Sequence, residues 1–122
     1  MFCSIGIPAY ADSGTYVSLS YRNYTIPGSV NGSKNGYYYH LTKGGVSLQV
    51  TETNSNNGQM YVDLRRYKSW GVDPSYGECR IYGTGWYNYK VDTDSDKYYI
   101  FASGGASGTV SKLKGYMHNH YH

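Results

Sequence analysis

The sequence predicts an all-β protein, an antiparallel β-sandwich or small barrel of about seven to eight short strands in a single domain. Apolar residues recur at every second position in several segments, and no window shows the i, i+3, i+4, i+7 spacing of an amphipathic helix. The composition agrees, with 17 Tyr and 16 Gly in 122 residues. Tyrosine favours strands, and glycine favours the turns between them.

Three segments alternate most clearly: residues 15–21, 45–52 and 59–66. In the second, Val46 and Leu48 share one face while polar residues occupy the other. One apolar and one polar face are typical of a half-buried antiparallel strand.

Further strands are expected over residues 36–42, 78–83, 85–91, 97–103 and 108 to the end. Short polar or glycine-rich clusters separate the strands and predict hairpin turns at 42–45, 54–58, 93–96 and 104–108.

Two further connections have distinct predictions. Residues 68–77 form the longest connection and contain Gly71 and Pro74, which predicts a crossover between sheets. Gly83 and Gly85 flank one residue inside a strand-like run, which predicts a bulge or tight bend.

The first residues, MFCSIGIPAYADSG, resemble the rear part of a secretory signal peptide. A short apolar run is followed by an Ala-Tyr-Ala triplet, the small-residue pattern that signal peptidase accepts. We therefore expect residues 1–11 to be a signal-peptide remnant, the mature domain to span 12–122, and the protein to be secreted. The alternative is that residues 2–7 form an edge strand.

The two cysteines are Cys3 and Cys79. Removal of the leader would leave Cys79 alone, and a lone cysteine then predicts a small buried core residue. Retention of the leader would permit a disulfide between the two, which the sequence does not decide. A secreted chain that avoids disulfides favours a Gram-positive bacterium as the source.

The net charge is +3, and no run of like charges is longer than Arg65-Arg66. This charge would help approach to an anionic cell wall, a membrane surface or a nucleic acid, and it selects none of them. Nucleic-acid binding is not predicted, because it requires a denser stripe of Lys and Arg. A membrane span is not predicted either, because no apolar stretch approaches about 20 residues.

The C-terminal segment places His118, His120 and His122 at alternate positions. Side chains at this spacing share one face of a strand, and two imidazoles could converge on a zinc ion. His40 and a carboxylate would have to complete such a site. The competing interpretation is a hydrated strand end.

The second candidate metal site is calcium at Asp92, Asp94 and Asp96, which alternate as in a calcium loop. The EF-hand pattern fails, because Lys97 and Ser103 stand where that loop requires Gly and Glu. The alternative is an acidic turn. No cofactor other than zinc or calcium is predicted.

No catalytic motif is present: the sequence has no nucleophile elbow, no His-Glu-x-x-His, no phosphate loop and no dinucleotide fingerprint. We therefore predict a protein that is not an enzyme.

The aromatic residues are the remaining candidates for a binding site. Consecutive aromatic residues on a strand face opposite sides, so several rings must lie outside the core. Tyrosine and tryptophan suit contact surfaces, because they combine a flat apolar ring with a polar tip. The predicted ligand-binding residues are Tyr38, Tyr61, Trp70, Trp86 and Tyr99. The alternative is that these rings only form cross-strand pairs.

These observations predict a secreted bacterial, non-catalytic binding module for a cell-envelope component, a glycan or peptidoglycan precursor, with an antimicrobial or toxin-like role as a subclass. The first alternative is an extracellular inhibitor or partner-binding protein that inserts the loop 68–77 into its target. The second alternative is a small metal-dependent hydrolase.

Overall fold

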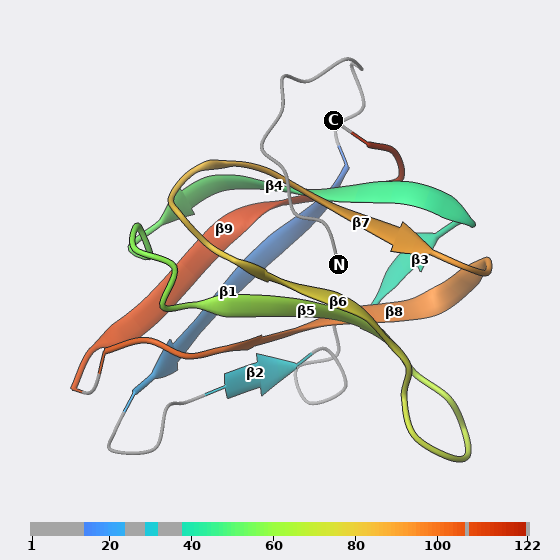
Figure 1. The fold of residues 1–122 in the computed structure, drawn as a ribbon, viewed down its shortest axis with the longest axis horizontal. Coiled ribbons are helices and arrows are strands. Elements are labelled where there is room, and N and C mark those ends of the chain that lie inside the picture. The colour runs from blue at the N-terminus through green and yellow to red at the C-terminus, as the bar shows by residue number, and fades with distance from the viewer. Residues whose placement is uncertain (1–13, 24–28, 32–37, 107, 122) are drawn as a thin grey trace.

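The computed structural model describes residues 14–23, 29–31, 38–106 and 108–121. Within these ranges the regular structure is β throughout, and the strands form two antiparallel sheets (Figure 1). The predicted β-sandwich is therefore confirmed. In the same ranges, no helix has the length and apolar character that crossing a bilayer requires.

The first sheet has the strand order β1-β9-β4-β7. Its strands are β1 (Thr15–Arg22), β9 (Val110–His118), β4 (Gly44–Thr53) and β7 (Gly85–Val91). β9 therefore lies between two neighbours, with Leu19 opposite Leu113 on one side and Leu48 opposite Met117 on the other.

The second sheet has the strand order β2-β8-β5-β6, with β3 also paired to β8. Its strands are β2 (Ser29–Asn31), β3 (Tyr39–Leu41), β5 (Tyr61–Arg66), β6 (Ser75–Arg80) and β8 (Ser95–Ser103). The described residues thus contain nine strands, one more than the upper end of the prediction. The three-residue strand β2 is the unpredicted one, because it is too short to show alternation.

The connections between strands differ most from the prediction. The polar clusters at 42–43, 54–60, 92–94 and 104–109 each join strands of different sheets, so the predicted hairpins at these positions are wrong. The segment predicted as a crossover instead closes a hairpin, because residues 67–74 join β5 to its neighbour β6. A short glycine-rich segment can close either kind of connection, and strand pairing decides between them.

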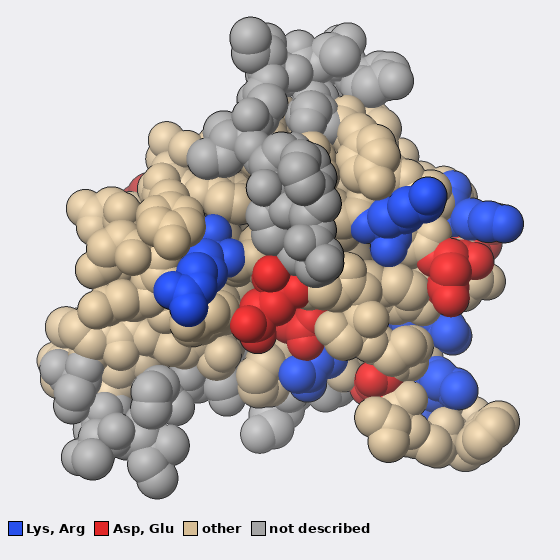
Figure 2. All heavy atoms as spheres, in the orientation of Figure 1, with Lys and Arg blue, Asp and Glu red and all other residues tan. Residues whose placement is uncertain are grey.

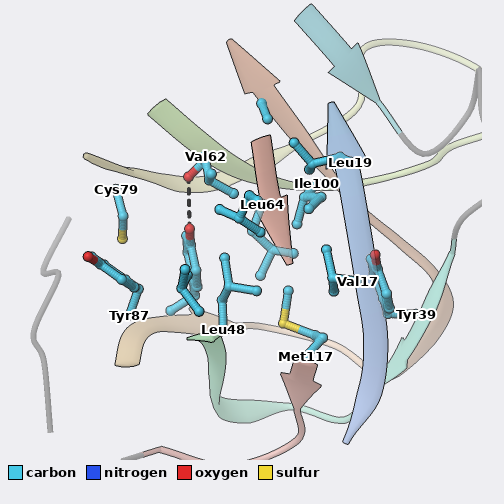
Figure 3. Close-up of a cluster of buried hydrophobic side chains, with 14 of the residues drawn as sticks. Val17, Leu19, Tyr39, Leu48, Val62, Leu64, Cys79, Tyr87, Ile100 and Met117 are labelled. Atoms are coloured by element: carbon cyan, nitrogen blue, oxygen red, sulfur yellow. Dashed lines mark hydrogen bonds between the residues drawn. The ribbon is translucent and has the colours of Figure 1, made fainter. Parts of the chain in front are cut away.

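The core lies between the two sheets and contains the apolar face of every long strand (Figure 3). Val17, Leu48 and Met117 come from the first sheet, and Leu64 and Ile100 come from the second. All five are at most 4% exposed. The predicted alternation therefore assigns the inward residues correctly.

Tyrosine is unusually frequent because many of its rings fill this core. Four buried tyrosines donate their hydroxyl group to a backbone carbonyl oxygen: Tyr21 to Gly104 at 2.7 Å, Tyr87 to Gly83 at 2.9 Å, Tyr89 to Val62 at 2.8 Å and Tyr98 to Thr93 at 2.5 Å. The bond to Val62 joins the two sheets (Figure 3). The other three bonds hold inter-sheet connections, so each phenol supplies both apolar volume and an anchor for a loop.

Gly115 marks the closest approach of two strands. It lies opposite Val50 in the β4–β9 pair, next to an irregularity in the register. A Cβ atom at this position would lie 1.8 Å from the backbone oxygen of Gln49. Only glycine fits here, which explains a glycine in the middle of a central strand.

Cys79 of β6 is fully buried and disulfide-bonded. Its predicted place in the core is confirmed, but a free core thiol is not what the structure contains. Cys3 lies outside the described residues, as do the predicted signal-peptide remnant 1–11, the alternative strand 2–7 and the start at Asp12. The Gram-positive source was predicted from a chain without disulfides, and that premise is wrong.

Candidate functional site

The outer face of the second sheet collects most of the predicted binding residues. In the β5–β8 pair, Tyr61 lies opposite Ser103 and Arg65 lies opposite Tyr99. Their neighbours in the chain point into the core, so these side chains point away from it. Tyr38 joins them, with its ring edge-on to Tyr99 at a centroid distance of 6.1 Å. We call this surface, with Arg80, Lys97 and Phe101, the aromatic face.

Tyr99 packs under the ring of Tyr38 in the aromatic face. It lies on the predicted outer side of β8, but only 4% of its surface is exposed, so the prediction of an open ring at this position is wrong. Its hydroxyl donates a 2.5 Å hydrogen bond to Asp73. Burial and then this hydrogen bond raise the pKa of Tyr99 to about 12.

Cations lie over the rings of the aromatic face. The Arg80 guanidinium is 4.7 Å from the ring centroid of Tyr61, and the Lys97 ammonium is 5.0 Å from that of Tyr38. Both cations are exposed, whereas both rings are half-buried. A ligand would therefore meet positive charge and π-surface together.

Two carboxylates near this surface are already engaged. Asp63 accepts hydrogen bonds from Arg65 at 2.7 Å and from Ser75 at 2.5 Å. Asp73 accepts from Tyr99 and from the backbone amide of Lys68.

One exposed carboxylate, Glu78, lies opposite Asp63 on β6. In the described ranges, Arg65 is the only cation in an ion pair. Arg80 and Lys97 are therefore available to an acidic ligand.

Trp70 lies beside the aromatic face, in the β5–β6 loop. Its predicted exposure is confirmed at 76%, and the Lys68 ammonium is 4.7 Å from its ring. The sequence interpretation missed Tyr67, which is 44% exposed and whose ring lies 6.3 Å from that of Tyr38. Only the pairing of β5 with β8 brings Tyr67 to this place, and alternation within one strand does not reveal that pairing.

Trp86 lies on the opposite surface, the outer face of the first sheet. It faces away from the core as predicted, but it is only 7% exposed, so an open ligand-binding ring at this position is wrong. Its ring lies 4.8 Å from that of His118, and His118 Nε2 is 2.9 Å from Gln49 Oε1. This arrangement is a buried polar and aromatic layer.

The predicted zinc site does not form among the described residues. His118 is 2% exposed in a strand with neighbours on both sides, so a hydrated strand end is wrong for it as well. The ring of His120 lies 5.5 Å from that of His118, but His40 is on β3 of the other sheet. In the described ranges no three His, Cys, Asp or Glu side chains gather as metal ligands would.

The three aspartates of the predicted calcium site do not converge. Asp92 accepts a hydrogen bond from the Tyr76 hydroxyl at 2.7 Å, and Asp94 accepts one from the amide of Lys43 at 2.8 Å. Asp96 is exposed at the start of β8. The arrangement is that of an acidic turn that bonds to neighbouring segments.

A pocket of about 230 Å³ opens at one end of the sandwich, between residues 54–60 and 105–111. Its lining is polar, but the polar side chains are largely used within the fold. Ser55 donates to the carbonyl of Ile81, and Asn54 donates to that of Val110. We assign these groups to the structure of the loops.

No protein-family model matches this chain, and no solved structure matches it.

Proposed function

We propose that the protein is a secreted, non-catalytic binding module whose aromatic face holds an acidic glycan of a cell envelope. The observation that carries this proposal is the pairing of an exposed cation with a half-buried tyrosine ring at two places, Arg80 over Tyr61 and Lys97 over Tyr38. Such a pair offers an acidic sugar an aromatic ring for its apolar face and a cation for its carboxylate or phosphate.

The chemistry follows from the two parts of each pair. The apolar side of a sugar ring packs on the flat face or edge of a phenol, while a carboxylate or phosphate approaches the cation. Tyr61, Arg80 and Lys97 lie on paired strands, and Tyr38 directly precedes β3, so little conformational entropy is lost when a ligand binds. The hydrogen bond from Tyr99 to Asp73 fixes the Tyr99 ring, against which Tyr38 packs.

Export is supported by Cys79. A disulfide-bonded cysteine is typical of secreted proteins and rare in a reducing cytosol. Cys3 is the only other cysteine in the sequence, so a disulfide within the chain requires that residues 1–11 are kept rather than removed as a signal peptide.

Charge reversal on the aromatic face tests the proposal. We expect the double variant Arg80→Glu/Lys97→Glu to bind an immobilised polyuronate at least about tenfold more weakly, because two attractive contacts become repulsive. The matched control is Lys112→Glu/Lys114→Glu, which makes the same charge change on exposed residues of β9 in the other sheet. A neutral glucan column shows how much binding depends on charge.

Equal weakening by the two double variants would contradict the proposal, because it would mean that only net charge matters. Tyr61→Ala, compared with Tyr16→Ala on the first sheet, separates stacking from charge. If the polyuronate binds the Tyr61 variant as tightly as the control variant, the ring takes no part in binding.

A further inference from the structure

The loop between β5 and β6, residues 67–74, carries the two most exposed large apolar side chains among the described residues. Trp70 is 76% exposed and Val72 is 89% exposed. The loop projects from the body of the sandwich at the lower right of Figure 1. Its protruding end is uncharged in Figure 2, with basic and acidic side chains beside its base.

This loop is tied down, so the exposure of its tip is a fixed property of the fold. The amide of Lys68 donates to Asp73 at 2.9 Å, which closes the loop across its tip. Asp73 is in turn held by the Tyr99 hydroxyl. At the base, the amide of Arg66 donates to the carbonyl of Pro74 at 3.1 Å.

The tip itself is shaped by Gly71. Its φ of +78° lies in the left-handed region, and a Cβ there would meet nothing within 4 Å. Glycine therefore permits the turn that places Trp70 and Val72 on either side of it. The two exposed apolar residues therefore flank Gly71 in the chain.

We propose that this loop is an interfacial anchor, which inserts Trp70 and Val72 into the headgroup region of an anionic lipid bilayer. Tryptophan and tyrosine are the residues enriched at the membrane–water boundary, and Tyr67 lies at the base of the loop, 44% exposed. The Lys68 ammonium stands over the Trp70 ring, where it would meet lipid phosphates as the indole enters.

A bilayer fits these observations better than a protein partner. A stable protein interface buries about 800 Å² on each side, and two side chains at a narrow tip supply only part of that area. Shallow insertion requires only a few apolar residues together with attraction to anionic lipid. The one carboxylate in the loop, Asp73, is occupied by two hydrogen bonds and does not face the lipid as a free charge.

This anchor uses residues other than the cation–ring pairs of the aromatic face, so the two proposals can fail separately. Lys97 connects the aromatic face to the β5–β6 loop, because its carbonyl accepts a 2.9 Å hydrogen bond from the amide of Tyr67. An inserted loop would therefore hold the aromatic face close to a membrane surface.

Co-sedimentation of the full chain with vesicles tests the anchor. We expect it to bind vesicles of phosphatidylcholine mixed with phosphatidylglycerol, and to bind phosphatidylcholine alone about tenfold more weakly. The variant Trp70→Ser/Val72→Ser should bind the mixed vesicles at least about tenfold more weakly than the unchanged chain. The matched control, Tyr16→Ser, removes an aromatic residue that is 54% exposed on β1 and should bind unchanged.

Indole fluorescence gives a second readout. Trp86 is buried and should keep its emission, so a shift to shorter wavelength on adding mixed vesicles would come from Trp70. No affinity for the mixed vesicles would overturn the proposal, whether or not the chain captures a protein. Binding that survives the loop variant, or that is lost equally in the Tyr16 control, would overturn it too.

Discussion

Raising the pH above 10 should unfold this protein cooperatively. Burial raises the pKa of five core or near-core tyrosines above the ordinary value of 10: Tyr21 and Tyr99 to about 12, and Tyr87, Tyr89 and Tyr98 also upward. Each phenol therefore holds its proton more tightly in the folded chain than in the unfolded chain. Its contribution is complete below pH 10 and is lost as the pH rises towards its folded pKa.

The expected loss is large. Each such tyrosine removes up to about 1.4 kcal/mol of unfolding free energy per pH unit, and four of them together remove about 5 kcal/mol. Two pH units would then consume the stability of a typical domain. The measurement is circular dichroism and phenolate absorbance over the same alkaline titration.

The part of the phenolate absorbance that comes from the buried phenols should appear together with the loss of circular dichroism, because these groups ionise when the fold opens. Phenolate absorbance that is complete near pH 10 while the circular dichroism stays native would contradict the buried assignment. The variant Tyr98→Phe removes one titrating group, so unfolding free energy should fall less steeply with pH in that variant, by up to about 1.4 kcal/mol per pH unit.

Replacing Gly115 by alanine should destabilise the fold by about 3 kcal/mol or more. The added Cβ would lie 1.8 Å from the carbonyl oxygen of Gln49, and the obstacle is backbone rather than a flexible side chain. β4 and β9 would have to separate at the centre of the first sheet. Urea unfolding of the variant measures the loss.

Gly83→Ala is the matched control for this variant. Gly83 has a φ of +88°, but a Cβ there would meet nothing within 4 Å, so only backbone strain of about 1 kcal/mol is expected. If the two alanine variants lose the same stability, the close approach of β4 and β9 is not the reason for Gly115.

The sequence predicts the strands of this protein better than their connections. Alternation is local, so the core positions of β1, β4 and β5 follow from it, and the predicted strand 85–91 coincides with β7. Whether a short turn leads to the next strand of one sheet or to the other sheet depends on contacts between distant residues. The predicted hairpin turn at 104–108 illustrates this, because the connection from β8 leads to β9 in the other sheet.

For the candidate site, alternation predicts to which side of the sheet a side chain points but not how much of that side chain is exposed. Tyr99 and Trp86 both point away from the core as expected, yet both are buried. Tyr99 is covered by a neighbouring ring and bonded to Asp73, which lies 26 residues earlier. Cation–ring pairs such as Arg80 with Tyr61 could be found only after β5 and β6 are paired in register.

The most direct test of the central claim is a map of the backbone amides that shift when a polyuronate is added to the labelled protein. We expect the shifts to concentrate on β5, β6 and β8 around Tyr61, Arg80 and Lys97, and to disappear in Arg80→Glu/Lys97→Glu. Shifts centred on the opposite sheet around Lys112 and Lys114, or shifts of the same size in that variant, would contradict binding at the aromatic face.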